Sequence, residues 1–271
     1  MSTPGALARA ARAYPTLLRV GFAEAVAYRA EMLVWMLTTT MPLVSLALWS
    51  AVAAEAPVGR FTQQRFSAYF LATLVVRQLT GCWLVWELNQ EIRSGSLSRR
   101  LLQPIHPLIA FSAENISALP LRAVLSAPVA ILALVVLDPG AIPASAPRLG
   151  VFALSLLGAW LINFLTMAVI GSLAFFLESS TALFEIWLVA FMLLSGYLVP
   201  LELFPPWLRA VTAALPFRYT VAFPVETLIG LLRMDEALRD LAVQWAYVAA
   251  CAAAALVTWR AGIKRFSALG G

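Results

Sequence analysis

Ionisable side chains inside long apolar runs are the residues of this sequence that could do chemistry. They are Arg77, Glu114, Arg122, Glu178 and Glu185. Charge is costly in such surroundings, so residues of this kind either pair inside a helix bundle or mark a transport pathway. Glu178 and Glu185 are seven residues apart and share a helix face, at a depth where Arg122 could pair with one of them. We predict an internal ion pair here, and for Arg77 snorkelling or pairing rather than a place in a pathway.

Enzyme chemistry has little support in the residues. The sequence has one histidine, His106, so neither a bis-histidine haem site nor a multi-histidine metal site can form within it. Cys82 and Cys251 lie in apolar runs, where cysteines behave as small hydrophobic residues. No G-x-x-x-x-G-K-[ST] phosphate-binding run is present, so ATP hydrolysis would require another chain. A transmembrane lipid-modifying enzyme would need a reactive cluster that these residues do not supply.

The elements that carry these residues must be membrane helices. Of the 271 residues, 62% are hydrophobic and 12% are charged. An ordinary soluble domain has about a quarter of its residues charged. The long apolar runs recur along the whole chain, so the bilayer must be the solvent. We predict an all-α integral membrane protein with one domain, residues 1–271, and no cleaved signal peptide.

Six apolar stretches are long enough to span the membrane, since about 20 residues cross the hydrocarbon core. They cover residues 32–54, 66–88, 119–137, 149–177, 182–199 and 241–259. Before the first, residues 1–28 place apolar side chains and arginines on different helix faces. This pattern predicts a basic amphipathic helix at the membrane interface.

Residues 200–230 break the pattern of spans. Prolines divide this segment into apolar pieces that are too short to cross the bilayer. Pro205 suits the start of a helix that presents Trp207 on its apolar stripe. We predict a re-entrant helical hairpin in the outer leaflet. Its gate residues would be Gly196, Tyr197, Pro200, Pro205 and Trp207.

Six spans place both termini on one side of the membrane. Ten cations fall on that side, namely Arg9, Arg12, Arg19, Arg29, Arg93, Arg99, Arg100, Arg260, Lys264 and Arg265. Seven arginines fall on the other, namely Arg60, Arg65, Arg148, Arg209, Arg218, Arg233 and Arg239. The positive-inside rule therefore predicts cytoplasmic termini in a bacterial plasma membrane. The net charge of +5 reflects this topology rather than nucleic-acid binding.

The loop at residues 89–107 is the most polar and basic part of the middle of the chain. Its residues 96–103 can form a short helix that ends at Pro104. Leu97 and Leu101 would lie on one face of this helix, and Arg99 and Arg100 on another. Such a helix can lie in a groove on a partner protein. The alternative is a solvated loop that only obeys the positive-inside rule.

The sequence resembles, over nearly its whole length, the permease subunits of ABC-2 type ATP-binding-cassette exporters. The resemblance rests on the basic N-terminal helix, the six spans, the Gly196-Tyr-Leu-Val-Pro200 exit and the loop. The loop is similar to an E-I-R-x-G-x-L…L-L-x-P-x-x-P-L run of one subgroup. The matching residues are Glu91, Ile92, Arg93, Gly95, Leu97, Leu101, Leu102, Pro104, Pro107 and Leu108.

This resemblance implies a permease that pairs with a second copy or a sister permease and sits on separate ATPase subunits. ATP and Mg would bind there, with no cofactor on this chain. The loop would be the coupling helix, with Leu97 and Leu101 in a groove of the ATPase. The ATPase-coupling residues would be Glu91, Arg93, Gly95, Leu97, Arg99, Arg100, Leu101 and Pro104. Such exporters carry drugs, antibiotics, lipids or glycans. An ion-coupled secondary carrier, which would need coupling residues at mid-depth, is the alternative.

Overall fold

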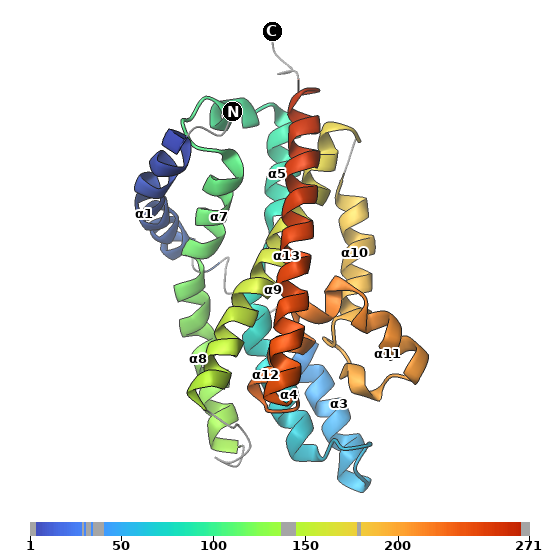
Figure 1. The fold of residues 1–271 in the computed structure, drawn as a ribbon. Coiled ribbons are helices and arrows are strands. Elements are labelled where there is room, and N and C mark those ends of the chain that lie inside the picture. The colour runs from blue at the N-terminus through green and yellow to red at the C-terminus, as the bar shows by residue number, and fades with distance from the viewer. Residues whose placement is uncertain are drawn as a thin grey trace.

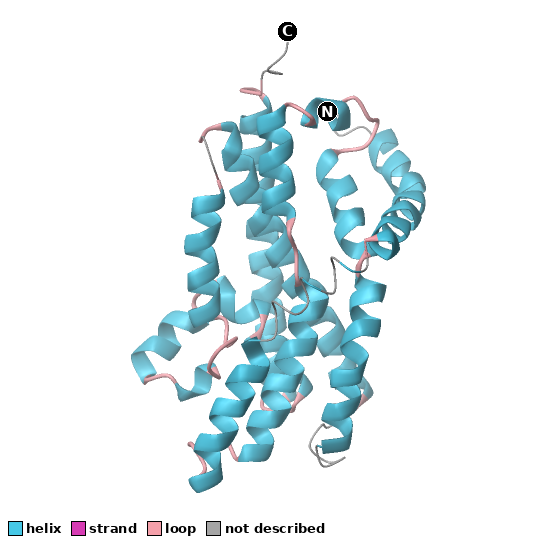
Figure 2. Cartoon of the chain, turned by 180° about the vertical axis from the view of Figure 1, so that it is seen from behind, coloured by secondary structure: helices cyan, strands magenta, loops and turns pink. Residues whose placement is uncertain are grey.

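The computed structural model describes residues 4–28, 30, 34, 41–136, 145–177 and 180–266. In these ranges every extended regular element is a helix, and Figure 2 draws no strand. The one β-type contact there is an isolated bridge between Val58 and Phe61. The predicted all-α class is confirmed.

The helices of the first half are mostly separated by short connections. They are α1 (Pro4–Ala27), α3 (Met41–Glu55), α4 (Gln63–Thr80), α5 (Leu84–Ser94), α6 (Leu97–Leu101), α7 (Pro107–Ser117) and α8 (Leu119–Val136). Local sequence explains several starts. The Thr62 hydroxyl accepts a hydrogen bond from the Arg65 backbone N–H and begins α4, and Pro107 occupies the first turn of α7.

The second half contains the two longest helices and a run of short ones. They are α9 (Ala146–Ser172), η1 (Leu173–Phe175), α10 (Thr181–Leu194), η2 (Leu201–Leu203), α11 (Pro206–Ala213), η3 (Pro216–Thr220), α12 (Ala222–Leu228) and α13 (Met234–Ile263). The short pieces coincide with the proline-rich segment 200–230. None of its four helices is long enough to cross a bilayer.

Three described stretches are long and apolar enough to span a membrane. They are Gln63–Ser94, Ala146–Phe175 and Met234–Ile263, and the helices Met41–Glu55 and Thr181–Leu194 are shorter apolar candidates. The predicted span 66–88 is not one continuous helix, because α4 ends at Thr80 and α5 begins at Leu84. Much of the predicted span 32–54 and of the loop after α8 lies outside the described residues.

The bundle is built around α9 and α13, which run side by side along its length (Figure 1). The α4–α5 stretch packs against α9, α3 packs against α4, and α8 packs against the other side of α4. α1 lies apart from this bundle, against α7. α11 projects from the side of the bundle.

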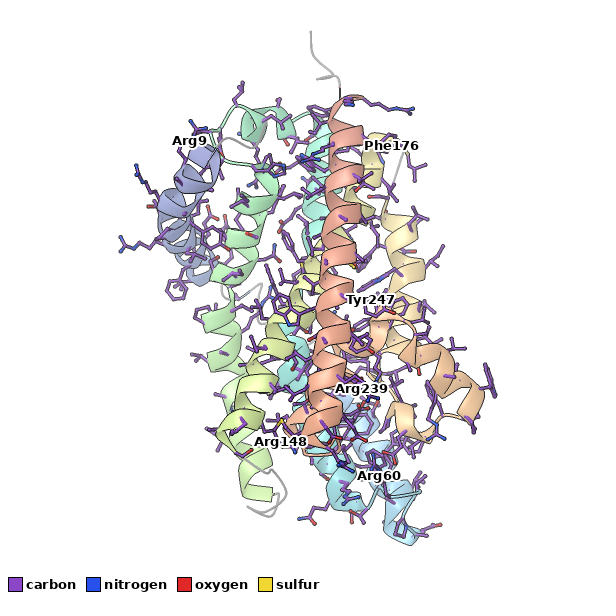
Figure 3. All side chains as sticks on the ribbon, in the orientation of Figure 1. Arg9, Arg60, Arg148, Phe176, Arg239 and Tyr247 are labelled. Carbon is purple, nitrogen blue, oxygen red and sulfur yellow. The ribbon has the colours of Figure 1, made fainter. Side chains whose placement is uncertain are left out.

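Four arginines from the two predicted sets can be located along the long axis of the molecule. Figure 3 shows Arg9 at one end of the molecule, near the end where α13 finishes, and Arg60, Arg148 and Arg239 at the other. The loop containing α6 lies at the end with Arg9. The α6 loop and segment 200–230 thus lie at different positions along the long axis of the molecule.

Candidate functional site

The α6 loop begins with a sharp turn at Gly95. Gly95 has φ +76°, in the left-handed region that favours glycine, and its N–H is bonded to the Ile92 carbonyl at the end of α5. The Ser98 hydroxyl donates to the Gly95 carbonyl at 2.7 Å and tightens the first turn of α6. The turn folds the short helix back onto its neighbours.

The leucines of this loop have different environments from those predicted. Leu97 is 0% exposed and packs in the protein's own core with Leu88 and Leu108. Leu101 is 37% exposed and Leu102 is 88% exposed. Leu97 is therefore unavailable to a partner, and the free apolar edge consists of Leu101 and Leu102. The helical spacing predicts Leu97 on the partner-facing side together with Leu101, and it does not include Leu102 there.

Arg100 also turns inward rather than toward a partner. Its Nε donates to both carboxylate oxygens of Glu91, at 2.8 and 2.9 Å, and its Nη1 donates to Glu114 at 2.6 Å. The guanidinium lies 4.1 Å from the centre of the Phe111 ring. Burial lowers the pKa of Arg100, but the hydrogen bonds and charges of Glu114 and Glu91 outweigh burial and raise it. Arg100 thus joins α5, α6 and α7.

The outer surface of the loop keeps the remaining predicted residues. Arg93, Arg99 and Pro104 are exposed together with Leu101 and Leu102. This group of five residues is called the loop edge below. It combines apolar and cationic side chains on a support whose inner face is buried.

His106 connects the loop to α7 and α13. Its Nδ1 accepts a hydrogen bond from the Leu108 N–H at 3.2 Å and caps the start of α7, and its ring lies 5.4 Å from that of Trp259. Partial burial, and then the charge of Arg260, lower the pKa of His106. The neutral imidazole is the form that can accept this bond.

The N-terminal helix rests on α7. The Tyr14 and Ser112 hydroxyls are 3.2 Å apart, and Gly21 allows α1 to approach Ser117 closely. The arginines of α1 at positions 9, 12 and 19 are exposed. An amphipathic helix with an exposed basic face, held beside the loop, has the arrangement expected of an interface helix.

Buried polar side chains from neighbouring helices meet at the break between α4 and α5. Arg122 Nη1 on α8 donates to the Gly81 carbonyl at 2.7 Å, and Asn163 Nδ2 on α9 donates to the Thr80 carbonyl at 3.2 Å. Carbonyls released by a broken helix need such partners at membrane depth. Arg122 therefore has a backbone partner at the break.

The other predicted members of this ion pair differ in what the structure describes. Glu185 is exposed on α10, and Glu178 lies outside the described residues. Arg77 is buried in the last turn of α4, with its guanidinium carbon 4.9 Å from the centre of the Phe191 ring. Its Nη1 atom has no hydrogen-bond partner. None of the ion pairs in the described ranges includes Arg77 or Arg122.

Two of the predicted gate residues, Gly196 and Tyr197, form a turn that fastens α10 to α4 and α12. Gly196 has φ +85°, and a Cβ there would meet Tyr69 Oη at 2.5 Å and Ala222 Cβ at 2.8 Å. Tyr69 Oη donates to the Gly196 carbonyl at 2.8 Å. Tyr197 is buried and its ring packs against Phe191. This turn is a fixed corner of the fold.

The rest of segment 200–230 divides into an exposed helix and an anchored one. Pro200 is buried before η2, whereas Pro205 and Trp207 on α11 are exposed, Trp207 at 68%. Arg218 bonds to Glu226 at 3.0 Å and to Asp240 on α13 at 2.9 Å. The segment is therefore fixed to α13 while α11 presents an apolar surface.

Sequence reasoning missed the uncharged polar partners. Asn163 and Gln244 are both fully buried inside long apolar helices. Gln244 Nε2 donates to the Ser155 and Tyr219 carbonyls, which ties α13 to α9 and η3. An amide inside a predicted span is a signal for an interhelical hydrogen bond. In the described part of the chain, no three histidine, cysteine or acidic residues gather as a metal site.

Comparison with known proteins identifies the architecture. The family model described as ABC-2 family transporter protein matches residues 40–270. The matched region includes the helix break, the α6 loop and segment 200–230. A comparison with curated proteins gave no significant match.

Proposed function

The chain belongs to the ABC-2 family of transporter proteins, and from this we propose that it is the membrane subunit of an ATP-driven exporter. Members of this family are multi-pass membrane subunits of transporters, and they work with a separate ATP-binding-cassette ATPase. In this proposal, two permease chains, either identical or sister chains, enclose the pathway. The cargo is an amphiphilic molecule of the drug, antibiotic, lipid or glycan type.

The observation that carries the proposal is the loop edge. Leu102 exposes 88% of its surface, and the adjacent Leu101 exposes 37%. The cationic Arg93 and Arg99 are exposed on the same loop. Apolar anchors surrounded by charge are typical of protein interfaces. An ATPase groove with an acidic rim fits this edge.

The buried side of the loop supports transmission of motion into the bundle. Arg100 holds α6 to Glu91 at the end of α5 and to Glu114 on α7. Leu97 inserts into the core between these helices. A force on the loop edge therefore acts on α5, which leads directly to the break at Gly81. This path links an ATPase on one side of the membrane to helices at membrane depth.

The experiment is co-purification of the ATPase with permease variants. Burial of two leucine side chains contributes roughly 3 to 5 kcal/mol before ordering costs. Leu101→Asp combined with Leu102→Asp is expected to weaken assembly at least a hundredfold and to abolish transport-linked ATP hydrolysis. Leu102→Met, which keeps the apolar contact, is the matched control.

Two outcomes would contradict the proposal. One is full ATPase binding and coupled hydrolysis by the double aspartate variant, provided that it inserts in the membrane normally. The other is gradient-driven flux by the purified chain alone, which would favour a secondary carrier.

A further inference from the structure

The break between α4 and α5 brings two buried cations to one point. A Cβ built on Gly81 would lie 3.6 Å from Arg122 Nη1 and 3.8 Å from Arg77 Nη1. The two guanidinium groups come from different helices, α8 and α4, and both reach the side of Gly81 that a side chain would occupy. The Arg77 carbonyl oxygen lies 3.2 Å from the same point, so an anion can bind only beyond this position, between the two guanidinium groups, whose N–H groups donate to an oxyanion at about 2.8 Å.

One of these cations has an unused donor. Arg77 is 9% exposed, and its Nη1 is buried without a hydrogen-bond partner. Arg122 is also buried but uses its Nη1 for the Gly81 carbonyl. The Phe191 ring compensates only part of the cost of burying the Arg77 charge. The donor and the charge together point to a missing anionic partner.

The charges nearby do not supply that partner. The described ion pairs all involve other arginines, as noted above. Glu87, on the first turn of α5, is close enough to Arg122 for their charges to interact, but it forms no ion pair with either arginine. The C-terminal end of α4 and the N-terminal end of α5 meet here, so their dipole ends oppose each other and the side-chain charges set the sign of the charge at the break. The excess charge at the break is positive.

The residues around the break are apolar, so the part of the ligand beyond its head group should be apolar too. Cys82, Leu84 and Val85 beside the break are almost fully buried, and Phe191 covers Arg77 from α10. One turn along α5, Trp86 is 40% exposed on the outer surface of the chain. An amphiphile lying along this surface can direct a charged head group toward Gly81 while its apolar part stays in contact with α5.

We propose that Arg77 and Arg122, beside Gly81, bind the oxyanion head group, a phosphate or a carboxylate, of an amphiphilic molecule. The molecule is either a resident lipid of the bilayer or a transported amphiphile. Binding requires only this chain, so the inference stands apart from ATPase coupling. Arg77 supplies the free donor, and Arg122 adds charge from the position that it holds as the partner of the Gly81 carbonyl.

Native mass spectrometry of the full-length chain in detergent tests this site. The probes are phosphatidylglycerol, palmitic acid and inorganic phosphate, with hexadecanol as the uncharged probe. The expected result is one tightly held anionic amphiphile per chain and weak binding of hexadecanol. Arg77→Gln should weaken this binding at least tenfold, and Arg77→Lys should restore much of it. Arg209→Gln, an exposed arginine on α11, should leave it unchanged.

A second variant keeps the test valid if Arg77→Gln fails to fold. Gly81→Ala leaves both arginines in place and narrows the space beside Gly81 that both Nη1 atoms border, so it too should weaken binding. Stoichiometric phospholipid in freshly purified protein identifies a resident lipid, whereas an empty site that takes up added palmitic acid or phosphatidylglycerol identifies a transported amphiphile. Equal binding by wild type, Arg77→Gln and Gly81→Ala, or binding of inorganic phosphate alone, would overturn the proposal.

Discussion

Arg100 Nε donates to both carboxylate oxygens of Glu91, at 2.8 and 2.9 Å, across the turn between α5 and α6. The same guanidinium holds Glu114 on α7, so one side chain fastens three helices. Arg100, which the sequence predicts to face a partner protein, is therefore part of the internal support of the loop.

Arg100→Gln should loosen this support without removing the loop edge. The carboxylates would lose charge-assisted hydrogen bonds, each worth about 1.5 to 3 kcal/mol when buried. The side chains are 20% to 34% exposed, so we expect a net loss of about 1 to 2 kcal/mol. Thermal unfolding in detergent measures it. Arg99→Gln, an exposed neighbour, should melt like wild type, and equal melting of both variants would show that Arg100 holds nothing.

Leu97 is buried and Leu102 is exposed, so truncating them should have different effects, one on stability and the other on ATPase binding. Leu97→Ala leaves a cavity in the core, and such truncations cost about 2 to 5 kcal/mol. Leu102→Ala should leave the melting temperature unchanged but weaken ATPase binding, because Leu102 is 88% exposed. Melting curves and co-purification are measured on the same two preparations. A stable Leu97→Ala chain that has lost the ATPase would restore the original docking prediction for Leu97.

The Gly196 corner should tolerate no side chain. Gly196→Ala combines a left-handed φ of +85° with a Cβ only 2.5 Å from Tyr69 Oη. Backbone strain of this kind costs about 1 to 3 kcal/mol, and the steric contact adds to it. Tyr69→Phe removes only the hydrogen bond to the Gly196 carbonyl, worth about 1 kcal/mol. Melting temperatures of the two variants are compared, and Gly196→Ala should melt at the lower temperature. A Gly196→Ala chain that melts above Tyr69→Phe would contradict the rigid turn at Gly196.

The helix break should depend on its interhelical donors. Asn163→Leu keeps the side-chain volume but leaves the Thr80 carbonyl without its partner from α9. Such bonds in membrane bundles contribute about 0.6 to 1.7 kcal/mol, so a modest drop in unfolding free energy is expected. Hydrogen exchange of the amides at residues 80–86 should increase at the same time. Unchanged exchange at the break would mean that Asn163 does not support it.

Much of the architecture was predictable because bilayer physics restricts it strongly. Apolar runs and prolines indicated the all-α class, the short pieces of segment 200–230 and the three predicted spans that coincide with Gln63–Ser94, Ala146–Phe175 and Met234–Ile263. The break at Gly81 was not predicted, since its neighbours Cys82 and Leu84 are as apolar as the rest of the run. Its cause lies in Arg122 and Asn163, which are distant in sequence.

The sequence predicted a short helix in this loop, but it did not predict correctly which of its side chains face inward. A five-residue helix such as α6 has too few positions for periodicity to fix its orientation. The Gly95 turn and the Arg100 contacts with Glu91 and Glu114 decide it, and they direct Leu97 inward. Glu114 was visible as a charge near an apolar run, but its partner depends on how the loop folds back.

The central claim is that the loop edge contacts the ATPase, and disulfide cross-linking tests it most directly. Leu102→Cys would be placed in a chain lacking Cys82 and Cys251, and the complex with the ATPase would be oxidised in membranes against single cysteines around the ATPase groove. The account predicts a cross-link from position 102 that ATP turnover modulates, and none from Trp207→Cys. No cross-link from position 102 together with labelling of that cysteine from outside the cell would contradict it.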